Sequence, residues 1–429
     1  MPSPLLMDRW PLLGDLRPPG CLVGAGVYVV LRHVLPRSCC LRPLSLVEPT
    51  VAIYLPEGIF LHPGGHTFAH QCDLKPSTSA RGDLNVATMN PLAVQVPHTD
   101  TEQQKLTFDR GVPRTLVHKT AVSEVLLTDA VRIGSNRYTV AAQWPQHHTL
   151  FGSGICPAGT ADPQLLVETV RQSGIYLSHV YYGVPQHHPF VLTSLEYELE
   201  PPTARSAART APHSVLVDVA CRLDAGVDDR FGMTLDATLV ADGRLEGRVG
   251  LCWQALSPER YQRVRYPRGR GRTTPVRPHA AILDLPPPVL PPRTFGRLHQ
   301  RDTMLAAGCT PDSWQLRLDT AHPVYFDHSC DHIPGMSLIE SFNQAAALSS
   351  AQATGADPAL LRWTLESSAV SFLAFGELDA PVTITAEPVP EPSELGRQPV
   401  RVAAEQDGRL LAAAALIGVL TSAAAGGAQ

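Results

Sequence analysis

The amino-acid sequence predicts a duplicated α+β fold, in which each copy combines one long helix with a series of antiparallel strands. A helical motif at 168–172 (ETVRQ) recurs 172 residues later at 340–344 (ESFNQ), and a Pro marks the helix entry before each copy. Downstream, Asp242-Gly243-Arg244-Leu245 is matched by Asp407-Gly408-Arg409-Leu410. Both Asp-Gly pairs lie between apolar runs and predict tight hairpin turns. Duplication therefore organises the chain, and we expect its chemistry to lie between the copies.

Upstream of each helix the repeat continues more weakly. Leu116-Val117-His118 in the first copy resembles Arg297-Leu298-His299 in the second. His148 follows His118 by 30 positions, and His328 follows His299 by 29. These spacings predict that His118 corresponds to His299 and that His148 corresponds to His328.

The first copy is expected to occupy residues 112-256. Alternating apolar residues between 116 and 142 indicate strands. A helix should run from 163 to 182, because Asp162 can cap its start, Pro163 suits the first helical position and Gly183 can end it. Four strand-like runs follow, at 190–199, 214–223, 233–241 and 245–256. One helix followed by antiparallel strands defines an α+β unit.

A linker rich in Pro and Arg, residues 257-292, is expected to separate the copies. Its Pro cluster at 286–288 should be extended. Against a single acid, Glu259, its first part carries a run of basic residues: Arg260, Arg263, Arg265, Arg268, Arg270, Arg272 and Arg277. Two hypotheses are open for this run. It is either a solvated, flexible tether or a docking strip for an acidic partner protein, which would bind in a salt-sensitive way.

The second copy is expected at residues 293-420, with its elements in the same order. Strands should extend to 318, a helix should begin at about Gly335, and further strands should include 372–375, 382–386 and 400–403. The uncharged stretch 410–429 predicts a final buried strand and a frayed tail. It is not expected to anchor the protein in a membrane, because a membrane span needs about 20 strongly apolar residues.

Residues 1-88 differ from both copies. They are rich in Pro, His and Leu, hold four of the nine cysteines and show no sustained helical or strand periodicity. Two hypotheses account for them. Either Met89 is the true start of translation and the preceding stretch is an over-extended reading frame, or the stretch is a disordered extension.

Composition limits the class of protein. A chain of 429 residues with 44% hydrophobic content is long enough for two domains with sizeable cores. The formal net charge of −5 excludes a generally basic nucleic-acid binder. Nine irregularly spaced cysteines show neither a disulfide framework nor paired C-x-x-C zinc ligands, so a reducing cytoplasm is the expected location. The first residues also lack the pattern of a secretory signal.

Both predicted helices carry polar groups among apolar neighbours. A stripe at helical spacing on the second helix should pack on the sheet: Leu338, Ile339, Phe342, Ala345 and Ala346. Other faces hold two matching polar sets: Glu168, Arg171 and Gln172, and Glu340, Asn343 and Gln344. A carboxylate in such surroundings needs a partner or a raised pKa. The two sets are therefore either catalytic groups or structural networks that tie helix to sheet.

The loop at 327–335, before the second helix, brings His328, His332 and two Asp residues close to a helix N-terminus. There the backbone amides of Gly335 and Met336 would favour a developing negative charge, so a thioester carbonyl would be polarised without a metal. The D-H-x-x-D-H spacing is also compatible with a metal site, but no metal is expected. P-loop, G-x-S-x-G and dinucleotide-binding fingerprints are missing where a strand would lead into a helix.

At this point the motifs resemble known proteins. The pattern Asp327-His328-x-x-Asp331-His332-x-Pro334-Gly335-Met336-x-Leu338-x-Glu340 resembles the active-site loop and helix of hotdog-fold hydroxyacyl carrier-protein dehydratases. With Pro145-x-x-His148 and the duplicated layout, the chain resembles the A-factor biosynthesis (AfsA) family of actinomycete double-hotdog proteins over roughly residues 112 to 420. This resemblance implies an α+β tandem (double) hotdog fold, an intramolecular pseudo-dimer in which each antiparallel sheet wraps around a long central helix.

The resemblance also implies an acyltransferase. A 3-oxoacyl group would pass from an acyl carrier protein to the hydroxyl of glycerone phosphate (dihydroxyacetone phosphate). Later steps would give a γ-butyrolactone, furan or butenolide signal that controls antibiotic production. The Arg-rich linker would then be a docking strip for the carrier protein. No cofactor, nucleic acid or membrane partner is expected.

Roles for individual residues follow from the resemblance. Glu340 is the candidate general base, and Glu168 is its duplicate. His328 and His332 are further catalytic candidates, and the amides of Gly335 and Met336 would hold the thioester oxyanion. The other candidate substrate-binding residues are Arg171, Gln172, Asn343, Gln344 and His148. The family commonly has Arg at the position of Asn343, so Arg171 is expected to be the remaining contact for an anion.

Two other functions compete with acyl transfer. A hotdog thioesterase or dehydratase would act on the same carrier-protein thioesters, with water in place of the acceptor alcohol or with a 3-hydroxyacyl substrate. A non-catalytic regulator would keep the acyl-binding groove without turnover, and Asn343 makes this alternative credible. Replacing Glu340 by Gln separates enzyme from regulator, because only the enzyme loses an activity.

Overall fold

The computed structural model describes residues 106–151, 162–201, 212–224, 230–266, 285–355, 357–390 and 397–422, and two short strands near the N-terminus. The chain divides into two compact units, 1–103 and 104–429. In the first unit β1 (Tyr28–Val29) pairs antiparallel with β2 (Ile53–Tyr54). The two hypotheses on residues 1-88, including a start at Met89, otherwise concern residues outside the described ones.

The second unit contains both copies of the repeat. Its first copy provides β3 (Leu127–Gly134), β4 (Arg137–Trp144), β5 (Phe190–Leu199), β6 (His213–Leu223), β7 (Arg230–Ala241) and β8 (Arg244–Leu256). Its second copy provides β9 (Leu305–Ala307), β10 (Ser313–Leu316), β11 (Leu361–Phe372), β12 (Thr383–Pro388), β13 (Arg397–Gln406) and β14 (Arg409–Ser422). The predicted hairpins form at Asp242-Gly243 and Asp407-Gly408, where all four residues have positive φ.

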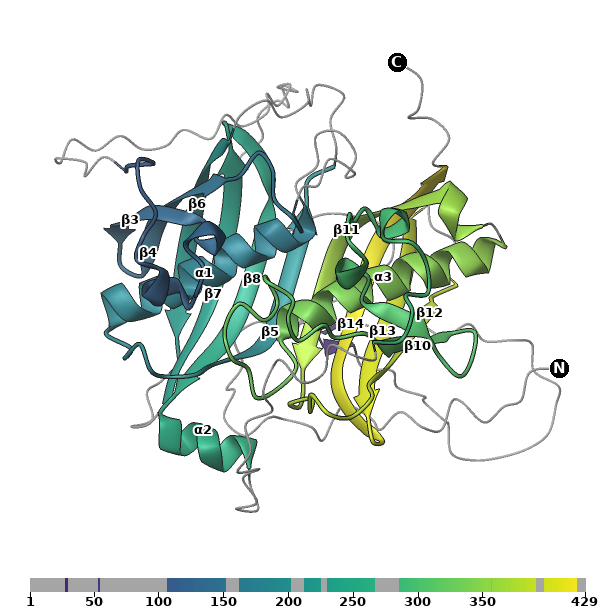
Figure 1. The fold of residues 1–429 in the computed structure, drawn as a ribbon. Coiled ribbons are helices and arrows are strands. Elements are labelled where there is room, and N and C mark those ends of the chain that lie inside the picture. The colour runs from purple at the N-terminus through teal and green to yellow at the C-terminus, as the bar shows by residue number, and fades with distance from the viewer. Residues whose placement is uncertain are drawn as a thin grey trace, which may run out of the picture. The chain divides into compact units, whose positions relative to one another are not determined.

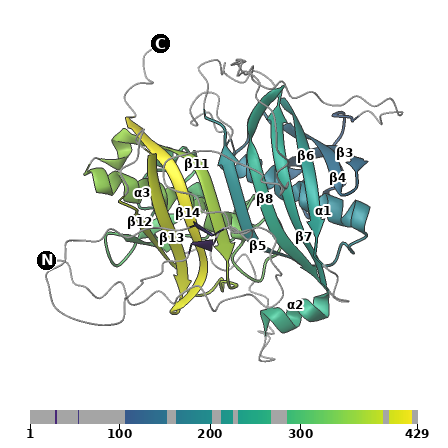
Figure 2. The same cartoon turned by 180° about the vertical axis from the view of Figure 1, so that it is seen from behind.

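The described strands of this unit form one 12-stranded sheet in the order β3-β4-β6-β7-β8-β5-β11-β14-β13-β12-β10-β9. Every pairing within this sheet is antiparallel. The copies meet where β5 pairs with β11, from Ser194 opposite Ser371 to Glu198 opposite Ser367. Two views of the unit show the long helices on the same face of this continuous sheet (Figures 1 and 2).

Each copy wraps its half of the sheet around one long helix. α1 (Pro163–Tyr182) begins after Asp162, whose side chain accepts a hydrogen bond from the Gln164 amide at 2.9 Å, and it ends at Gly183 with φ 67°. α3 (Gly335–Thr354) lies over β11, β12, β13 and β14 (Figure 1). The predicted helix positions are confirmed.

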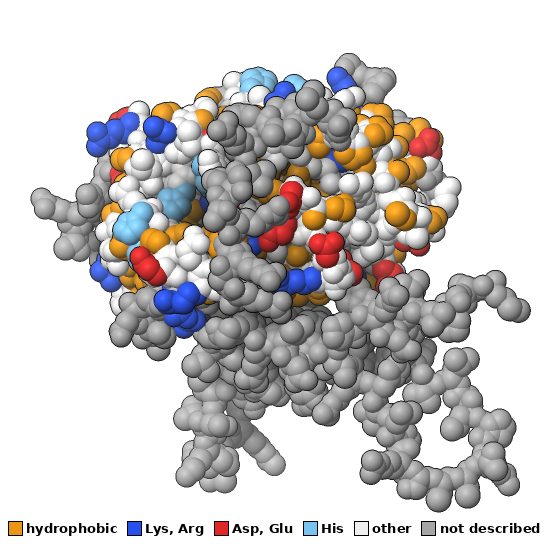
Figure 3. Space-filling view, turned by 60° about the horizontal axis from the view of Figure 1, so that its bottom comes forward, with side chains coloured by type: hydrophobic (Ala, Val, Ile, Leu, Met, Phe, Trp, Pro, Cys, Tyr) orange, Lys and Arg blue, Asp and Glu red, His pale blue; other side chains and the backbone are white. Residues whose placement is uncertain are grey.

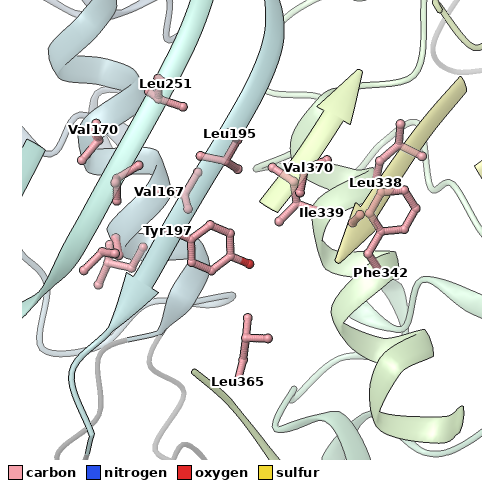
Figure 4. Packing of buried hydrophobic residues seen from close by; sticks show 14 of the residues in the cluster. Val167, Val170, Leu195, Tyr197, Leu251, Leu338, Ile339, Phe342, Leu365 and Val370 are labelled. Carbon is pink, nitrogen blue, oxygen red and sulfur yellow. The ribbon is translucent and has the colours of Figure 1, made fainter. Parts of the chain in front are cut away.

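Apolar side chains from helix and sheet form the core of both copies. Figure 4 shows Val167 and Val170 of α1 on the face of the sheet that carries Leu195 of β5. It also shows Phe342 of α3 on the face that carries Val370 of β11. None of these five side chains is more than 2% exposed. Burying one such side chain contributes about 1.5–3 kcal/mol, so this layer holds each helix on the sheet.

One glycine permits close contact between α1 and the sheet. A Cβ at Gly174 would lie 2.7 Å from the Trp253 ring of β8, closer than van der Waals contact allows. The indole therefore occupies the space that a side chain on this helix turn would need.

The described first part of the linker differs from the flexible tether that one of the two hypotheses expects. Its first part is a helix, α2 (Pro258–Arg265), capped by Ser257, and it lies apart from the two long helices in Figure 1. Arg265 is buried and donates to both carboxylate oxygens of Glu377 at 2.7 Å. It also donates to the Asp331 carbonyl at 2.8 Å, so α2 holds the loop before α3. A docking role for Arg268, Arg270, Arg272 and Arg277 concerns residues outside the described ones.

Two details of the second copy refine the predictions. β11 ends at Phe372, so the strand predicted at 372–375 is wrong beyond its first residue. The reason is that the amides of Leu373 and Ala374 both donate to the Leu411 carbonyl, which breaks the ladder. The predicted final strand is confirmed as β14, which pairs with β11 and β13.

No helix in the described part of the chain is both long and apolar enough to cross a membrane. On the face drawn in Figure 3, charged side chains of both signs are dispersed among hydrophobic and uncharged ones.

Candidate functional site

A pair of equivalent Gln side chains ties each helix to the start of a strand. Gln172 accepts from the Leu126 amide at 2.9 Å and donates to the Glu124 carbonyl at 2.7 Å and to Glu168 at 2.9 Å. Gln344 makes the matching contacts with the Met304 amide, the Asp302 carbonyl and Glu340, all at 2.8 Å. Both amide groups are therefore engaged within the protein, as the structural-network hypothesis expects. Their predicted contact with substrate stays a prediction.

The structure corrects the predicted register of the repeat. Short 3-10 turns, η2 (Arg114–Val117) and η5 (Pro292–Phe295), are followed by His118 and Gly296, both in the left-handed conformation with φ 52° and 70°. His118 therefore corresponds to Gly296, and the predicted match to His299 is wrong. The true register is set by backbone conformation, which the short side-chain match did not reveal. The next residues, Lys119 and Arg297, become equivalent.

His148 also has a different counterpart from the predicted one. Its Nδ1 accepts the amides of Leu150 and Phe151, both at 3.1 Å, and its Nε2 lies 3.2 Å from Glu124. His322 repeats this arrangement with two following amides and Asp302. The predicted match of His148 to His328 is therefore wrong. In both copies this His holds a turn, which leaves His328 without an equivalent role.

In the second copy, Glu340 lies within a buried network that joins both copies. Arg297 donates to its two oxygens at 2.9 and 2.7 Å. The same guanidinium reaches Asp162, the N-cap of α1, at 2.5 Å and the Leu150 carbonyl at 2.9 Å. Gln344 and Gln164 complete the set with further hydrogen bonds to Glu340. We call these five side chains the Arg297 network: Arg297, Glu340, Asp162, Gln164 and Gln344.

The Arg297 network leaves Glu340 little freedom to act as a base. Its side chain is 1% exposed, and each oxygen already accepts two hydrogen bonds. One cation faces two carboxylates, Glu340 and Asp162. Such a buried pair is costly to break, by about 3–5 kcal/mol, because the remaining charge would be uncompensated.

In the first copy the ratio of charges is reversed, because two cations face the single carboxylate of Glu168. Arg171 donates to its two oxygens at 2.8 and 2.9 Å, and the Lys119 Nζ lies 3.1 Å away. Burial favours the neutral carboxyl, but Arg171 and Lys119 outweigh it and hold the pKa of Glu168 well below its usual value. We call Glu168, Lys119, Arg171 and Gln172 the Glu168 cluster. Two cations face one carboxylate within this cluster, and the Asp327 carboxylate also acts on Arg171.

Arg171 is the more accessible cation of the Glu168 cluster. Its side chain is 23% exposed, against 4% for Lys119. Its hydrogen bonds to Glu168 use Nε and Nη2, and its Nη1 has no hydrogen-bond partner among the described residues. The equivalent Asn343 instead accepts a hydrogen bond from the Trp363 indole at 3.0 Å.

A loop from the second copy completes this site. Asp327 accepts from the amides of Thr120 and Ala121 at 2.7 and 3.0 Å, which ties the loop before α3 to the first copy. His328 is exposed next to this tie, and partial desolvation together with the Arg171 cation lowers its pKa. Burial and Asp331 raise the pKa of the Cys330 thiol to about 11, so it is a neutral thiol rather than a nucleophile.

His332 lies on the same loop but is directed toward α2. Its Nδ1 is 2.7 Å from Asp331 and 3.3 Å from the Tyr261 hydroxyl, and its ring packs edge-on against Phe375. Burial raises the pKa of Asp331, but hydrogen bonds from His332 and Tyr261 outweigh this and lower it overall. His332 thus contacts Asp331 and Tyr261, while burial and Arg171 lower the pKa of His328.

The N-terminal turns of the two helices meet beside this loop. Gln164 of α1 donates to the Met336 carbonyl of α3 at 3.2 Å. Gly335 and Met336 are the first residues of α3, where amides have no intrahelical acceptor. Among the described residues, no three His, Cys, Asp or Glu side chains come together as a metal ion would require.

His118 and His179 form a pair that sequence reasoning missed as a site. Their Nε2 atoms lie 2.9 Å apart, and the His179 Nδ1 is 2.7 Å from the Val184 carbonyl. Burial, His179 and the Arg171 guanidinium lower the pKa of His118 to about 3. Lys119 and Arg297 were missed too. Their signal was the basic residue that follows each 3-10 turn, which is recognisable only once the true register is known.

Two halves of a continuous antiparallel sheet, each wrapped around a long helix, define a double hotdog protein with an interface site formed by both copies. The chain belongs to the A-factor biosynthesis hotdog domain family (AfsA), which matches residues 100–257 and 282–422. The family and the fold predicted from the sequence are confirmed.

The curated proteins to which the chain is similar share one name. The chain is 40% identical over 298 residues to a 2-oxo-3-(phosphooxy)propyl 3-oxoalkanoate synthase of Streptomyces virginiae, covering 69% of this chain and 93% of the relative. It is 31% identical over 304 residues to a synthase of the same name from Streptomyces coelicolor, covering 70% and 89%. Among solved structures, the acyl-CoA thioesterase II TesB2 of Mycobacterium marinum is similar with a TM-score of 0.34 and 16% identity, over 72% of this chain and 98% of that one.

Proposed function

We propose that this protein is an acyltransferase that moves a 3-oxoacyl group to the hydroxyl of glycerone phosphate, in the biosynthesis of a γ-butyrolactone-type signal that controls antibiotic production. Its membership of the family and the shared name of its relatives support this reaction. The acyl donor is a thioester on an acyl carrier protein, and the cytoplasm is the location in which both substrates would meet. The reaction needs no cofactor.

The observation that carries the proposal is the Glu168 cluster, in which two cations face one carboxylate and Arg171 is partly exposed. A phosphate monoester is a dianion, and Arg171 presents its unused Nη1 beside Lys119. The Arg297 network provides no such charge, because its cation is neutralised by two carboxylates. We therefore place acyl transfer at the first copy, with glycerone phosphate bound by Arg171.

We assign the thioester carbonyl of the acyl donor to the N-terminus of α3. Gly335 and Met336 are the first residues of α3, so their amides could donate to an oxyanion, and the helix dipole would add to their effect. The acceptor oxygen adds to the carbonyl carbon and loses its proton to a base. The tetrahedral intermediate then breaks its C–S bond, and the leaving thiolate takes a proton. The products are the phosphorylated 3-oxoacyl ester and the free carrier-protein thiol.

The test uses the full chain with a 3-oxoacyl carrier protein and glycerone phosphate, followed by mass spectrometry. We expect a phosphorylated acyl ester. Free 3-oxo acid as the main product would refute the transferase in favour of a thioesterase, and binding without turnover would favour a regulator.

Arg171→Gln tests the phosphate contact. A charged hydrogen bond contributes about 1.5–3 kcal/mol, so the KM for glycerone phosphate should rise roughly 10–100-fold. Arg397→Gln is the matched control, because Arg397 also pairs with a Glu, at 2.7 Å from Glu366, but lies on the surface of β13. An Arg171→Gln protein with an unchanged KM would overturn the assignment of the phosphate to this side.

A further inference from the structure

Acyl transfer needs a base for the acceptor hydroxyl, and both helical Glu side chains are buried and held by ion pairs that stabilise their charged form. Glu340 and Glu168 each accept hydrogen bonds or ion pairs on both oxygens from cations and amides. We propose that His118 is the general base of the first-copy site, and that His179 is the positioning residue that fixes its tautomer. This inference rests on the proposed function and names the base of the same site.

The backbone at His118 is the first observation that supports this. It has φ 52°, a conformation that L side chains rarely adopt. The other described non-Gly residues with positive φ are Asn136, Asp242 and Asp407, of two residue types that, like His, adopt it more often than most. The equivalent position in the second copy is Gly296. Because the second copy uses Gly at this position, the turn itself does not require the imidazole of His118.

The hydrogen bonds assign the proton positions. The Val184 carbonyl can only accept, so His179 donates to it through Nδ1–H. The Nε2 of a neutral His179 is then an acceptor, and His118 must donate to it through Nε2–H. The Nδ1 of His118 is left as the atom that can take a proton, and the nearby Gln186 carbonyl favours the protonated form.

The surroundings of His118 suit a base that works on a phosphorylated alcohol. The Phe190 ring packs edge-on against it, with ring centroids 5.0 Å apart, and reduces its contact with water. The charged and titratable groups that face it are His179 and Arg171 of α1 and His328 of the loop before α3. Arg171 is among the groups that lower the pKa of His118. A phosphate dianion on Arg171 would offset the contribution of Arg171 to this shift, while burial and His179 would continue to lower the pKa of His118.

The proton balance of the step is complete. His118 Nδ1 takes the proton of the acceptor hydroxyl as the C–O bond forms. The resulting imidazolium returns this proton to the thiolate as the C–S bond breaks. The second copy lacks the pair, because Gly296 and Ala351 occupy the positions equivalent to His118 and His179. The asymmetry between the copies therefore includes the base as well as the phosphate contact.

The test replaces His118 by Gly and by Asn, both of which tolerate the left-handed backbone and should preserve the fold. We expect kcat to fall by about 100-fold or more, with the KM for glycerone phosphate nearly unchanged. Added imidazole should restore part of the activity of His118→Gly, and His147→Asn, which replaces an exposed His, should behave as wild type. His179→Gln keeps an acceptor for His118 and should retain more kcat than His179→Leu.

The outcomes separate the two proposals. An unchanged kcat in His118→Gly would overturn the base assignment alone. Loss of activity without imidazole rescue and with a lower melting temperature would give His118 a structural role and also overturn it. A wild-type protein that forms no ester would instead refute the proposed function.

Discussion

Replacing Glu340 by Gln separates a structural ion pair from a catalytic base. The change keeps the size of the side chain but removes the charge that faces Arg297, and it places an amide donor among groups that already donate. Asp162 remains as a partner for Arg297. Removing one member of a buried pair costs about 3–5 kcal/mol, and the remaining partner favours the lower end, about 3 kcal/mol.

Thermal unfolding followed by circular dichroism measures this cost. A loss of about 3 kcal/mol should lower the melting temperature by roughly 4–5 °C for a unit of this size. At an assay temperature below its melting temperature, the Glu340→Gln protein should keep most of the wild-type kcat. Glu366→Gln is the control, because it breaks a surface pair with Arg397 and should change stability by less than about 1 kcal/mol. A Glu340→Gln protein with wild-type stability and a kcat reduced by about 100-fold or more would refute this reasoning and restore Glu340 as the base.

Two further predictions concern the first copy. The pKa of Glu168 is lowered in the folded state, so its contribution to stability is present above the unfolded value of about 4.3 and is lost as pH falls toward the folded pKa. Urea unfolding at pH 7 and pH 3 should therefore show a larger loss for wild type than for Glu168→Gln, and equal losses would contradict the ion-pair assignment. Gly174→Ala should cost about 1–3 kcal/mol, because its Cβ would lie 2.7 Å from Trp253, and an unchanged urea midpoint would show that the indole moves aside.

Local signals in the sequence predicted the long helices and most strands well. Asp162, Pro163 and Gly183 mark the ends of α1 because caps and breakers act through bonds to near neighbours. The contact between Glu168 and Arg171 was accessible for the same reason, since three positions on a helix bring side chains together.

Contacts between distant residues were not accessible in this way. Lys119 reaches Glu168 from a 3-10 turn, and Arg297 reaches Asp162 across the two copies. Arg265 looked like one of many solvated cations until its bidentate contact with Glu377 buried it. In each case a long basic side chain reaches a carboxylate that is distant in the sequence, and only tertiary packing brings the two close together. The sequence alone therefore suggested that these charges face solvent.

The difference between the Arg297 network and the Glu168 cluster has a consequence for how such a protein evolves. In a homodimer of identical subunits, every substitution occurs in both subunits. A substitution that stabilises an interface site but removes its reactivity therefore inactivates both equivalent sites. Fusion into one chain removes this symmetry. One interface site now has two carboxylates, Asp162 and Glu340, on Arg297, while the other has two cations, Lys119 and Arg171, on Glu168. A single chain can in this way be both more durable and still reactive, which an exact dimer cannot achieve with one set of residues.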